Sequence, residues 1–219
     1  MSQPVFYIIM GPNGAGKSTF GRLYTKGISI YDPDKRRMEI EKFFCSMTSE
    51  QLKQMYPMYT ADMLDDLFEK LVDDYKSKEY AKCRDICIEN NLNFALETPF
   101  ADNFGLDEVL LFKKKGYSIN GILFGLNTVE ESIANVALRV QKKGHDLLLE
   151  SIRWNFKHSY LNVYNHINLF DQLHFVHAQS VAENPFLFAS YSEGIINFSS
   201  SQPSVPLWFS LFAQYSYKT

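Results

Sequence analysis

Cysteine is scarce in this 219-residue chain, and Cys45, Cys83 and Cys87 show no metal-binding spacing. A sparse, odd set of cysteines is typical of a reducing compartment and argues against a disulfide framework. Cys83 and Cys87 are four residues apart in a stretch that reads as helix, so we expect them to share one face and to pack against other residues.

Long apolar runs are also missing. No stretch approaches the roughly 18–20 apolar residues that a membrane-spanning helix needs. The first residues lack the charged and apolar regions of a signal peptide. We therefore expect a cytoplasmic protein with no membrane partner.

The chain has no excess of positive charge. It carries 22 Lys and Arg against 25 Asp and Glu, for a formal net charge of −3. Proteins that bind nucleic acids usually show a basic excess or a basic stripe. The charge balance therefore predicts no nucleic-acid partner.

The composition is that of a folded globular protein, with 46% hydrophobic and 21% charged residues. Apolar and amphipathic segments alternate along the chain, which predicts an α/β fold with three layers, a mostly parallel central sheet and helices on both faces. Strands are expected at residues 5–10, 28–31, 93–97, 118–124, 172–178, 186–190 and 195–198. Helices are expected at about 17–26, 61–90, 106–115, 129–140 and 149–164, and one more from about residue 35.

No internal repeat and no low-complexity linker interrupts the chain. We therefore predict a single domain over residues 1–219. The segment 203–219 contains several large apolar side chains, among them Trp208 and Phe212. We expect this tail to pack on the domain or to meet a protein partner.

One motif identifies a nucleotide site. Residues 11–19 read Gly-Pro-Asn-Gly-Ala-Gly-Lys-Ser-Thr and match G-x-x-x-x-G-K-[ST] in full. A strand precedes the motif and a helix follows it, as phosphate binding at a helix N-terminus requires. The motif predicts bound ATP and Mg²⁺, and its residues are Gly11, Pro12, Asn13, Gly14, Ala15, Gly16, Lys17, Ser18 and Thr19.

The chemistry of the motif explains its residues. The glycines let successive N–H groups point inward at phosphate oxygens. Lys17 places a positive charge on the β- and γ-phosphates, and the Ser18 hydroxyl is suited to ligate Mg²⁺. Lys17 is therefore a candidate catalytic residue, and Ser18 is a candidate metal ligand.

Signatures of two other P-loop classes are missing. Transporter-type ATPases carry an L-S-G-G-Q-like motif and a strand ending in Asp-Glu, and GTPases read guanine with N-K-x-D; this chain has none of these. These absences disfavour a GTPase and an ATPase coupled to a larger assembly. A kinase-like arrangement remains, in which positioning and charge neutralisation provide most of the catalysis.

Two carboxylates follow predicted strands. Asp34, in the turn after residue 31, could accept the proton of an acceptor hydroxyl, or it could simply cap the helix that begins at Lys35. Glu97 and Thr98 end the third strand, at the edge of the sheet where α/β proteins bind ligands. Glu97 could contact substrate or metal-bound water, or it could pair with a nearby lysine.

Two arginines flank the segment around Gly144 and His145. Arg139 and Arg153 could close over the phosphates as a lid, because the guanidinium fork matches phosphate oxygens. The alternative is that each lies on a solvated helix face.

Together these residues resemble the zeta-toxin family of P-loop kinases. The resemblance rests on residues 11–19, the Asp32-Pro33-Asp34 turn, and segments 94–98, 121–126, 136–140, 144–145 and 152–153. It implies that Asp34 is the catalytic base, that Glu97 and Thr98 lie on the substrate side, and that Arg139 and Arg153 clamp phosphate. It also implies a small-molecule acceptor, UDP-N-acetylglucosamine in that family, and an antitoxin protein as partner.

The chain departs from the family pattern near the second arginine. A cluster of arginines is replaced by Arg153-Trp154-Asn155-Phe156. With fewer cations in the lid, an alternative function stays open: a slow or non-catalytic ATP-binding switch that acts on a protein partner through the apolar tail.

Overall fold

The computed structural model describes residues 3–141, 147–178, 184–199 and 205–212. Contacts divide the chain into two compact units: residues 1–31 with 91–219 form unit 1, and residues 32–90 form unit 2. The single-domain interpretation stays a prediction.

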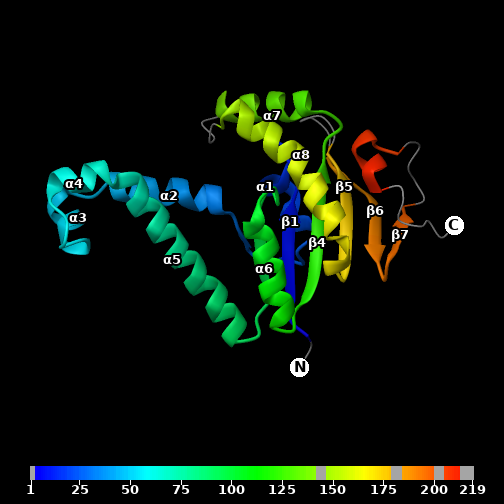
Figure 1. The fold of residues 1–219 in the computed structure, drawn as a ribbon, viewed down its shortest axis with the longest axis horizontal. Helices are drawn as coiled ribbons and strands as arrows, with labels where there is room; N and C mark the ends of the chain where they lie inside the picture. Colours follow the sequence, from blue (N-terminus) through cyan, green and yellow to red (C-terminus); the bar gives the residue numbers. More distant parts are fainter. Residues whose placement is uncertain (1–2, 142–146, 179–183, 200–204, 213–219) are drawn as a thin grey trace. The chain divides into compact units, whose positions relative to one another are not determined.

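Unit 1 is built on a twisted sheet with the order β2-β3-β1-β4-β5-β6-β7 (Figure 1). The first five strands in this order pair in parallel, and the last two pair antiparallel. The predicted α/β fold with a mostly parallel central sheet is confirmed. Its strands are β1 (Val5–Met10), β2 (Ile30–Tyr31), β3 (Phe94–Glu97), β4 (Ser118–Gly125), β5 (Gln172–His177), β6 (Phe186–Ser192) and β7 (Ile195–Phe198).

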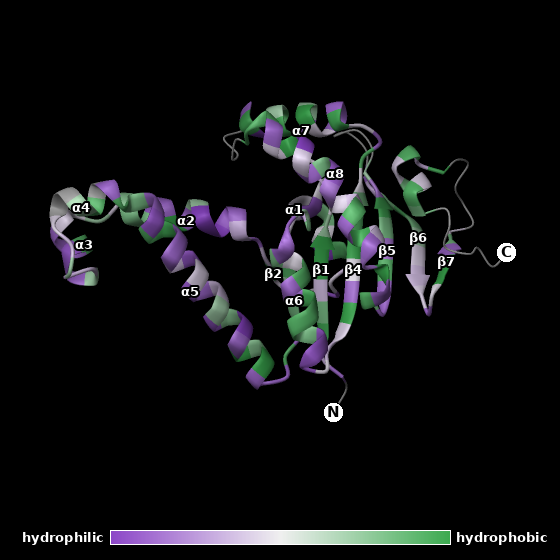
Figure 2. Cartoon of the chain, in the orientation of Figure 1, coloured by the Kyte–Doolittle hydropathy of each residue, from purple (hydrophilic) through white to green (hydrophobic). Residues whose placement is uncertain are grey.

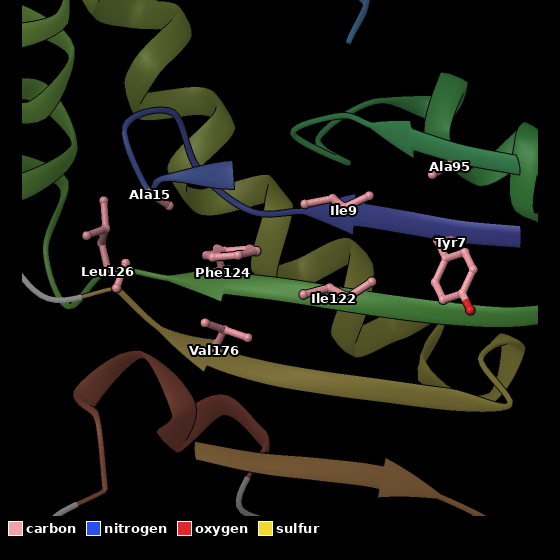
Figure 3. Close-up of a cluster of buried hydrophobic side chains, with 9 residues drawn as sticks. Tyr7, Ile9, Ala15, Ala95, Ile122, Phe124, Leu126 and Val176 are labelled. Carbon is pink, nitrogen blue, oxygen red and sulfur yellow. The ribbon is translucent and has the colours of Figure 1, made fainter. Parts of the chain in front are cut away.

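The central strands are apolar on both sides, as Figure 2 shows for β1. On one face, Phe6 stacks on Phe112 of α6 (Asn103–Lys114), with ring centroids 4.0 Å apart. The other face carries the cluster of Figure 3, in which Tyr7 and Ile9 lie beside side chains from β3, β4 and β5. Burial on both faces explains why these strands are continuous apolar runs rather than alternating ones.

Short helices connect or flank the strands of unit 1. The helix after the P-loop is brief: α1 (Lys17–Phe20) passes directly into a 3₁₀ turn, η1 (Gly21–Leu23), so the expected helix to residue 26 is shorter than predicted. The chain then turns through left-handed Lys26 and Gly27. The longer helices are α6, α7 (Val129–Gln141) and α8 (Leu149–Asn165), and η2 (Ile167–Leu169) follows α8.

Unit 2 is helical in its described residues. It comprises α2 (Pro33–Cys45), α3 (Ser49–Met55), α4 (Ala61–Asp66) and α5 (Phe68–Glu89). Phe44 of α2 is buried with Leu71 and Val72 of α5, and these apolar side chains form the core of the unit. The helix predicted over residues 61–90 is divided at Leu67, and α3 was not predicted.

The cysteines of unit 2 differ from expectation. Cys83 is exposed and Cys87 is only half-buried. The prediction that both are packing residues is wrong for Cys83, because its side of α5 faces solvent.

The described part of the tail packs on unit 1. It forms a 3₁₀ helix, η3 (Leu207–Phe212), in which Trp208, Phe209 and Phe212 are buried. Phe209 meets Phe175 of β5 edge to face, with ring centroids 5.0 Å apart. The rings that suggested a partner surface therefore cover this chain's own sheet.

Candidate nucleotide site

The P-loop joins β1 to α1 at the carboxyl edge of the sheet. Gly11, Gly14 and Gly16 all have positive φ, at 127°, 75° and 84°. At Gly11 the need for glycine is also steric, because a Cβ there would lie 2.1 Å from the carbonyl oxygen of Phe124. Only glycine satisfies both constraints, so the loop passes close against β4.

Lys17 lies over the loop and is almost fully buried, with 7% of its surface exposed. Its Nζ donates to the carbonyl oxygens of Gly11 at 2.9 Å and Pro12 at 3.0 Å. A buried ammonium group held by backbone carbonyls at the mouth of a loop is positioned to meet an anion.

Ser18 contacts the carboxylate that the sequence analysis placed at the end of β3. Its Oγ donates to Oε1 of Glu97 at 2.7 Å. Glu97 is 8% exposed, so this carboxylate is buried directly beside the P-loop. The two residues are 79 positions apart in sequence, and the parallel pairing of β1 with β3 brings them together.

The Ser18 and Glu97 pair is chemically suited to Mg²⁺. A hydroxyl and a carboxylate supply hard oxygen ligands, which Mg²⁺ prefers, and Mg²⁺ in nucleotide sites keeps few protein ligands because phosphates and waters complete its shell. The described residues contain no cluster of three or more His, Cys, Asp or Glu side chains that could hold a metal ion.

Thr98 has a backbone role. Its N–H donates to the carbonyl of Ile9 at 3.0 Å, and its Oγ1 accepts from the N–H of Phe100 at 3.1 Å. Phe100 has a φ of 58°, and the Thr98 contact stabilises this unusual turn. The chain therefore turns sharply after Glu97.

Asp34 lies in unit 2, in the first turn of α2. The N-cap of this helix is Asp32, whose side chain accepts from the N–H groups of Asp34 and Lys35 at 3.1 Å each. The alternative in which Asp34 itself caps the helix is therefore wrong. Its role as a base stays a prediction.

Helix α7 crosses the P-loop. Ser132 Oγ donates to the carbonyl of Asn13 at 2.6 Å, and Asn135 Nδ2 donates to the carbonyl of Gly14 at 3.0 Å. A capping box begins α7, since Glu131 N–H donates to Thr128 Oγ1 at 3.2 Å and the Glu131 carboxylate accepts from Thr128 N–H at 3.4 Å.

The register of α7 places Arg139 on the same side as these two contacts. Arg139 follows Asn135 by four residues, which is about 40° around the helix and about 6 Å along it. Its side chain is half-buried. The face of α7 that contacts the loop therefore also carries the predicted lid arginine.

Helix α8 also contacts the loop, but not through its arginine. Asn155 Nδ2 donates to Oδ1 of Asn13 at 2.8 Å. Arg153 precedes Asn155 by two residues, about 200° around the helix, and is exposed. The register therefore favours Arg139 over Arg153 as a phosphate contact, and both roles stay predictions. Gly144 and His145 lie outside the described residues.

Ser132, Asn135 and Asn155 were missed by the sequence analysis. Small polar residues on an amphipathic helix read as ordinary surface positions, and no local pattern shows that these helices cross the P-loop. Only the departure from the family pattern at residues 153–156 marked this part of α8 as unusual.

None of the helices in the described part of the chain combines the length and apolar character needed to cross a bilayer. This agrees with the lack of long apolar runs in the sequence.

A scan against protein-family models finds no match, and no curated protein matches this sequence. Solved structures do match. One belongs to the PezAT chromosomal toxin-antitoxin system of Streptococcus pneumoniae, with a TM-score of 0.55, 18% identity, and coverage of 84% of this chain and 72% of that one.

Two further structures match over much of the chain. The AvrRxo1-ORF1:AvrRxo1-ORF2 complex with sulphate ions gives a TM-score of 0.58 at 11% identity, covering 98% of this chain and 64% of that one. The Pnkp1/Rnl/Hen1 RNA repair complex gives a TM-score of 0.54 at 17% identity, and the match covers 75% of this chain and 47% of that one. This chain therefore spans less than two thirds of the length of the matched chain in both the AvrRxo1 complex and the RNA repair complex.

These likenesses establish the fold. This chain shares its α/β fold with a protein of the PezAT toxin-antitoxin system over 84% of its length and with a protein of the AvrRxo1-ORF1:AvrRxo1-ORF2 complex over 98%.

Proposed function

We propose that this chain is an ATP-dependent phosphotransferase that transfers the γ-phosphoryl group of MgATP to a hydroxyl of a small molecule. The observation that carries the proposal is the 2.7 Å contact between Ser18 and Glu97 beside a complete P-loop. A P-loop alone supports nucleotide binding, whereas a buried carboxylate at the metal-ligating serine supports chemistry on the phosphates. The resemblance of the sequence to the zeta-toxin family of P-loop kinases supports the same class of reaction.

Each residue then has a defined task. Lys17 and the N-terminus of α1 attract the polyphosphate, and Arg139 adds positive charge on the α7 side of the loop. Ser18 and Glu97 would hold Mg²⁺, which when bound neutralises charge on the β- and γ-phosphates. Asp34 accepts the proton of the acceptor hydroxyl as that oxygen attacks phosphorus and the bond to the β-phosphate oxygen breaks.

The identity of the phosphate acceptor is the most specific part of the proposal. The zeta-toxin resemblance makes UDP-N-acetylglucosamine the first candidate. The net charge of −3 argues against a polynucleotide acceptor.

The direct test is a transfer assay with labelled ATP against a panel of UDP-sugars, nucleosides and a 5′-hydroxyl RNA. We expect transfer to a small acceptor by the wild type, loss of transfer in Lys17→Ala, and a decrease of about 10²–10⁴-fold in Asp34→Asn. Asp32→Asn is the matched control, because Asn also caps helices and only the carboxylate is lost.

Two outcomes would overturn parts of the proposal. Equal transfer by Asp34→Asn and wild type would remove Asp34 as the base. Binding of MgATP without transfer to any member of the panel would favour the switch alternative. The burial of Trp208, Phe209 and Phe212 argues against a switch that acts through the tail, because these rings are not available to a partner.

A protein partner belongs to the same proposal. PezAT is a chromosomal toxin-antitoxin system, and AvrRxo1-ORF1 forms a complex with AvrRxo1-ORF2. If this chain is a toxin, its expression should arrest growth and Lys17→Ala should relieve the arrest. Equal growth inhibition by both forms would contradict a toxic kinase activity.

A further inference from the structure

The P-loop carbonyls are held in two different ways. Those of Gly11 and Pro12 accept from Lys17, which is the group expected to move onto a phosphate. Those of Asn13 and Gly14 accept from Ser132 and Asn135, which lie on another helix. The second pair of contacts does not compete with the ligand.

The α7 contacts determine which way the loop amides point. In a planar trans peptide, the C=O group and the next N–H group point in opposite directions. Because the carbonyls of Asn13 and Gly14 point at α7, the N–H groups of Gly14 and Ala15 point away from it. Phosphate-binding loops depend on such a set of oriented N–H groups.

The contacts are close and buried. Ser132 is fully buried, and Asn13 is 4% exposed. A Cβ at Gly14 would lie 2.8 Å from the Cβ of Asn135, so the helix packs directly against the loop backbone. Asn155 of α8 adds a contact to the Asn13 side chain at 2.8 Å.

We propose that Ser132 and Asn135 are positioning residues that keep the P-loop shaped for polyphosphate and link it to the helix that carries Arg139. The link to Arg139 rests on the proposed function, whereas the effect on polyphosphate binding does not. Asn155 supports the same shape from α8. The predicted lid helix is thereby part of the nucleotide site before any nucleotide binds.

The test uses magnesium tripolyphosphate as the probe, because it contacts the loop without a base or sugar. Calorimetry should show affinity about tenfold weaker in Ser132→Ala and in Asn135→Ala, since each change leaves a buried carbonyl without its donor. Ser132→Thr keeps the hydroxyl and should recover most of the affinity.

The matched control is Thr25→Val. Thr25 is also fully buried, and its Oγ1 donates to the carbonyl of Ile28 at 2.9 Å, so it loses the same kind of hydrogen bond outside the P-loop. We expect Thr25→Val to lower the melting temperature as Ser132→Ala does while leaving tripolyphosphate affinity unchanged.

Kinetics separates positioning from a general structural role. Ser132→Ala should raise the KM for ATP about tenfold with kcat nearly unchanged, because the contact acts equally on bound ATP and on the transition state. If Ser132→Ala and Asn135→Ala bind tripolyphosphate as the wild type does, the inference is wrong even if the wild type proves to be a kinase. If both weaken binding but the wild type transfers no phosphate, the inference stands and the proposed function fails.

Discussion

At the scale of single residues, the site depends on backbone conformations that only glycine adopts easily. Gly14 and Gly27 both have left-handed φ values, 75° and 83°. They differ in their surroundings: a Cβ at Gly14 would press on Asn135, while a Cβ at Gly27 would have no atom within 4 Å. Substituting these two glycines therefore distinguishes the effect of backbone strain, which both share, from the effect of contact with α7, which only Gly14 has.

Gly14→Ala and Gly27→Ala should each destabilise the fold by about 1–2 kcal/mol, the cost of a left-handed conformation for a residue with a side chain. Only Gly14→Ala should also weaken MgATP binding by more than about tenfold, because Asn135 and the loop must move apart. Denaturant unfolding and calorimetry measure the two effects. Similar nucleotide affinity in both variants would contradict the close contact between loop and helix.

Features of the site that depend on a short stretch of sequence were predictable. The P-loop, the capping box of Thr128 and Glu131, and the carboxylate at the end of β3 all follow from short-range rules. The contacts of Ser132, Asn135 and Asn155 were not predictable, because they depend on which helix crosses the loop after folding. Asp34 and Asp32 were hard to separate for a different reason: both lie at the start of α2, and either could cap it.

At the scale of elements, η3 packs against the end of β4 and the residues that follow it. Trp208 covers Gly125, where a Cβ would lie 2.1 Å from the indole ring. Leu207 N–H donates to Oδ1 of Asn127 at 2.9 Å. Tyr160 of α8 stacks on Trp208 and its hydroxyl contacts both backbone polar groups of Leu126. The segment that leads into α7 is thereby fixed from two sides.

Trp208→Ala should therefore destabilise unit 1 by about 3–5 kcal/mol, the usual cost of removing a large buried aromatic side chain. Leu207→Ala is the control, because Leu207 is 72% exposed and should change stability by less than about 0.5 kcal/mol. Urea unfolding measures both. A Trp208→Ala variant as stable as the wild type would mean that η3 does not pack as described.

The boundaries of helices and strands were predicted best where turn residues mark both ends of an apolar run. β1 and β7 match their predicted ranges, and β3 and β4 differ by one residue. β1, β3 and β4 are almost fully buried, and such strands are short apolar runs bounded by turn residues. The helix after the P-loop was overestimated because Gly21 allows a change to 3₁₀ geometry. The division at Leu67 lies inside a continuous apolar stripe, so periodicity could not detect it.

At the scale of the whole molecule, stability should depend on two half-buried histidines of β5. Burial lowers the pKa of His174 below its usual value of 6.5. Burial also lowers the pKa of His177, although the Gly125 carbonyl and Glu131 partly oppose this. Both histidines are therefore neutral in the folded state at a pH where the unfolded chain already binds protons.

The free energy of unfolding should consequently fall as the pH falls below about 6.5. The unfolded state binds more protons in this window, so each histidine contributes a slope of at most about 1.4 kcal/mol per pH unit. Denaturant unfolding of the wild type and His174→Gln between pH 5 and 8 measures this. The variant should show a shallower slope, and an unchanged slope would contradict a role for His174.

The account as a whole depends on a loop that captures polyphosphate with magnesium at Ser18 and Glu97. Isothermal titration calorimetry with MgATP tests this most directly, using the wild type, Lys17→Ala and Glu97→Gln. We predict saturable binding by the wild type, loss of most affinity in Lys17→Ala, and in Glu97→Gln a requirement for about 10–100-fold more Mg²⁺. Folded wild-type protein that releases no heat with MgATP, or Lys17→Ala binding as tightly as the wild type, would contradict the account.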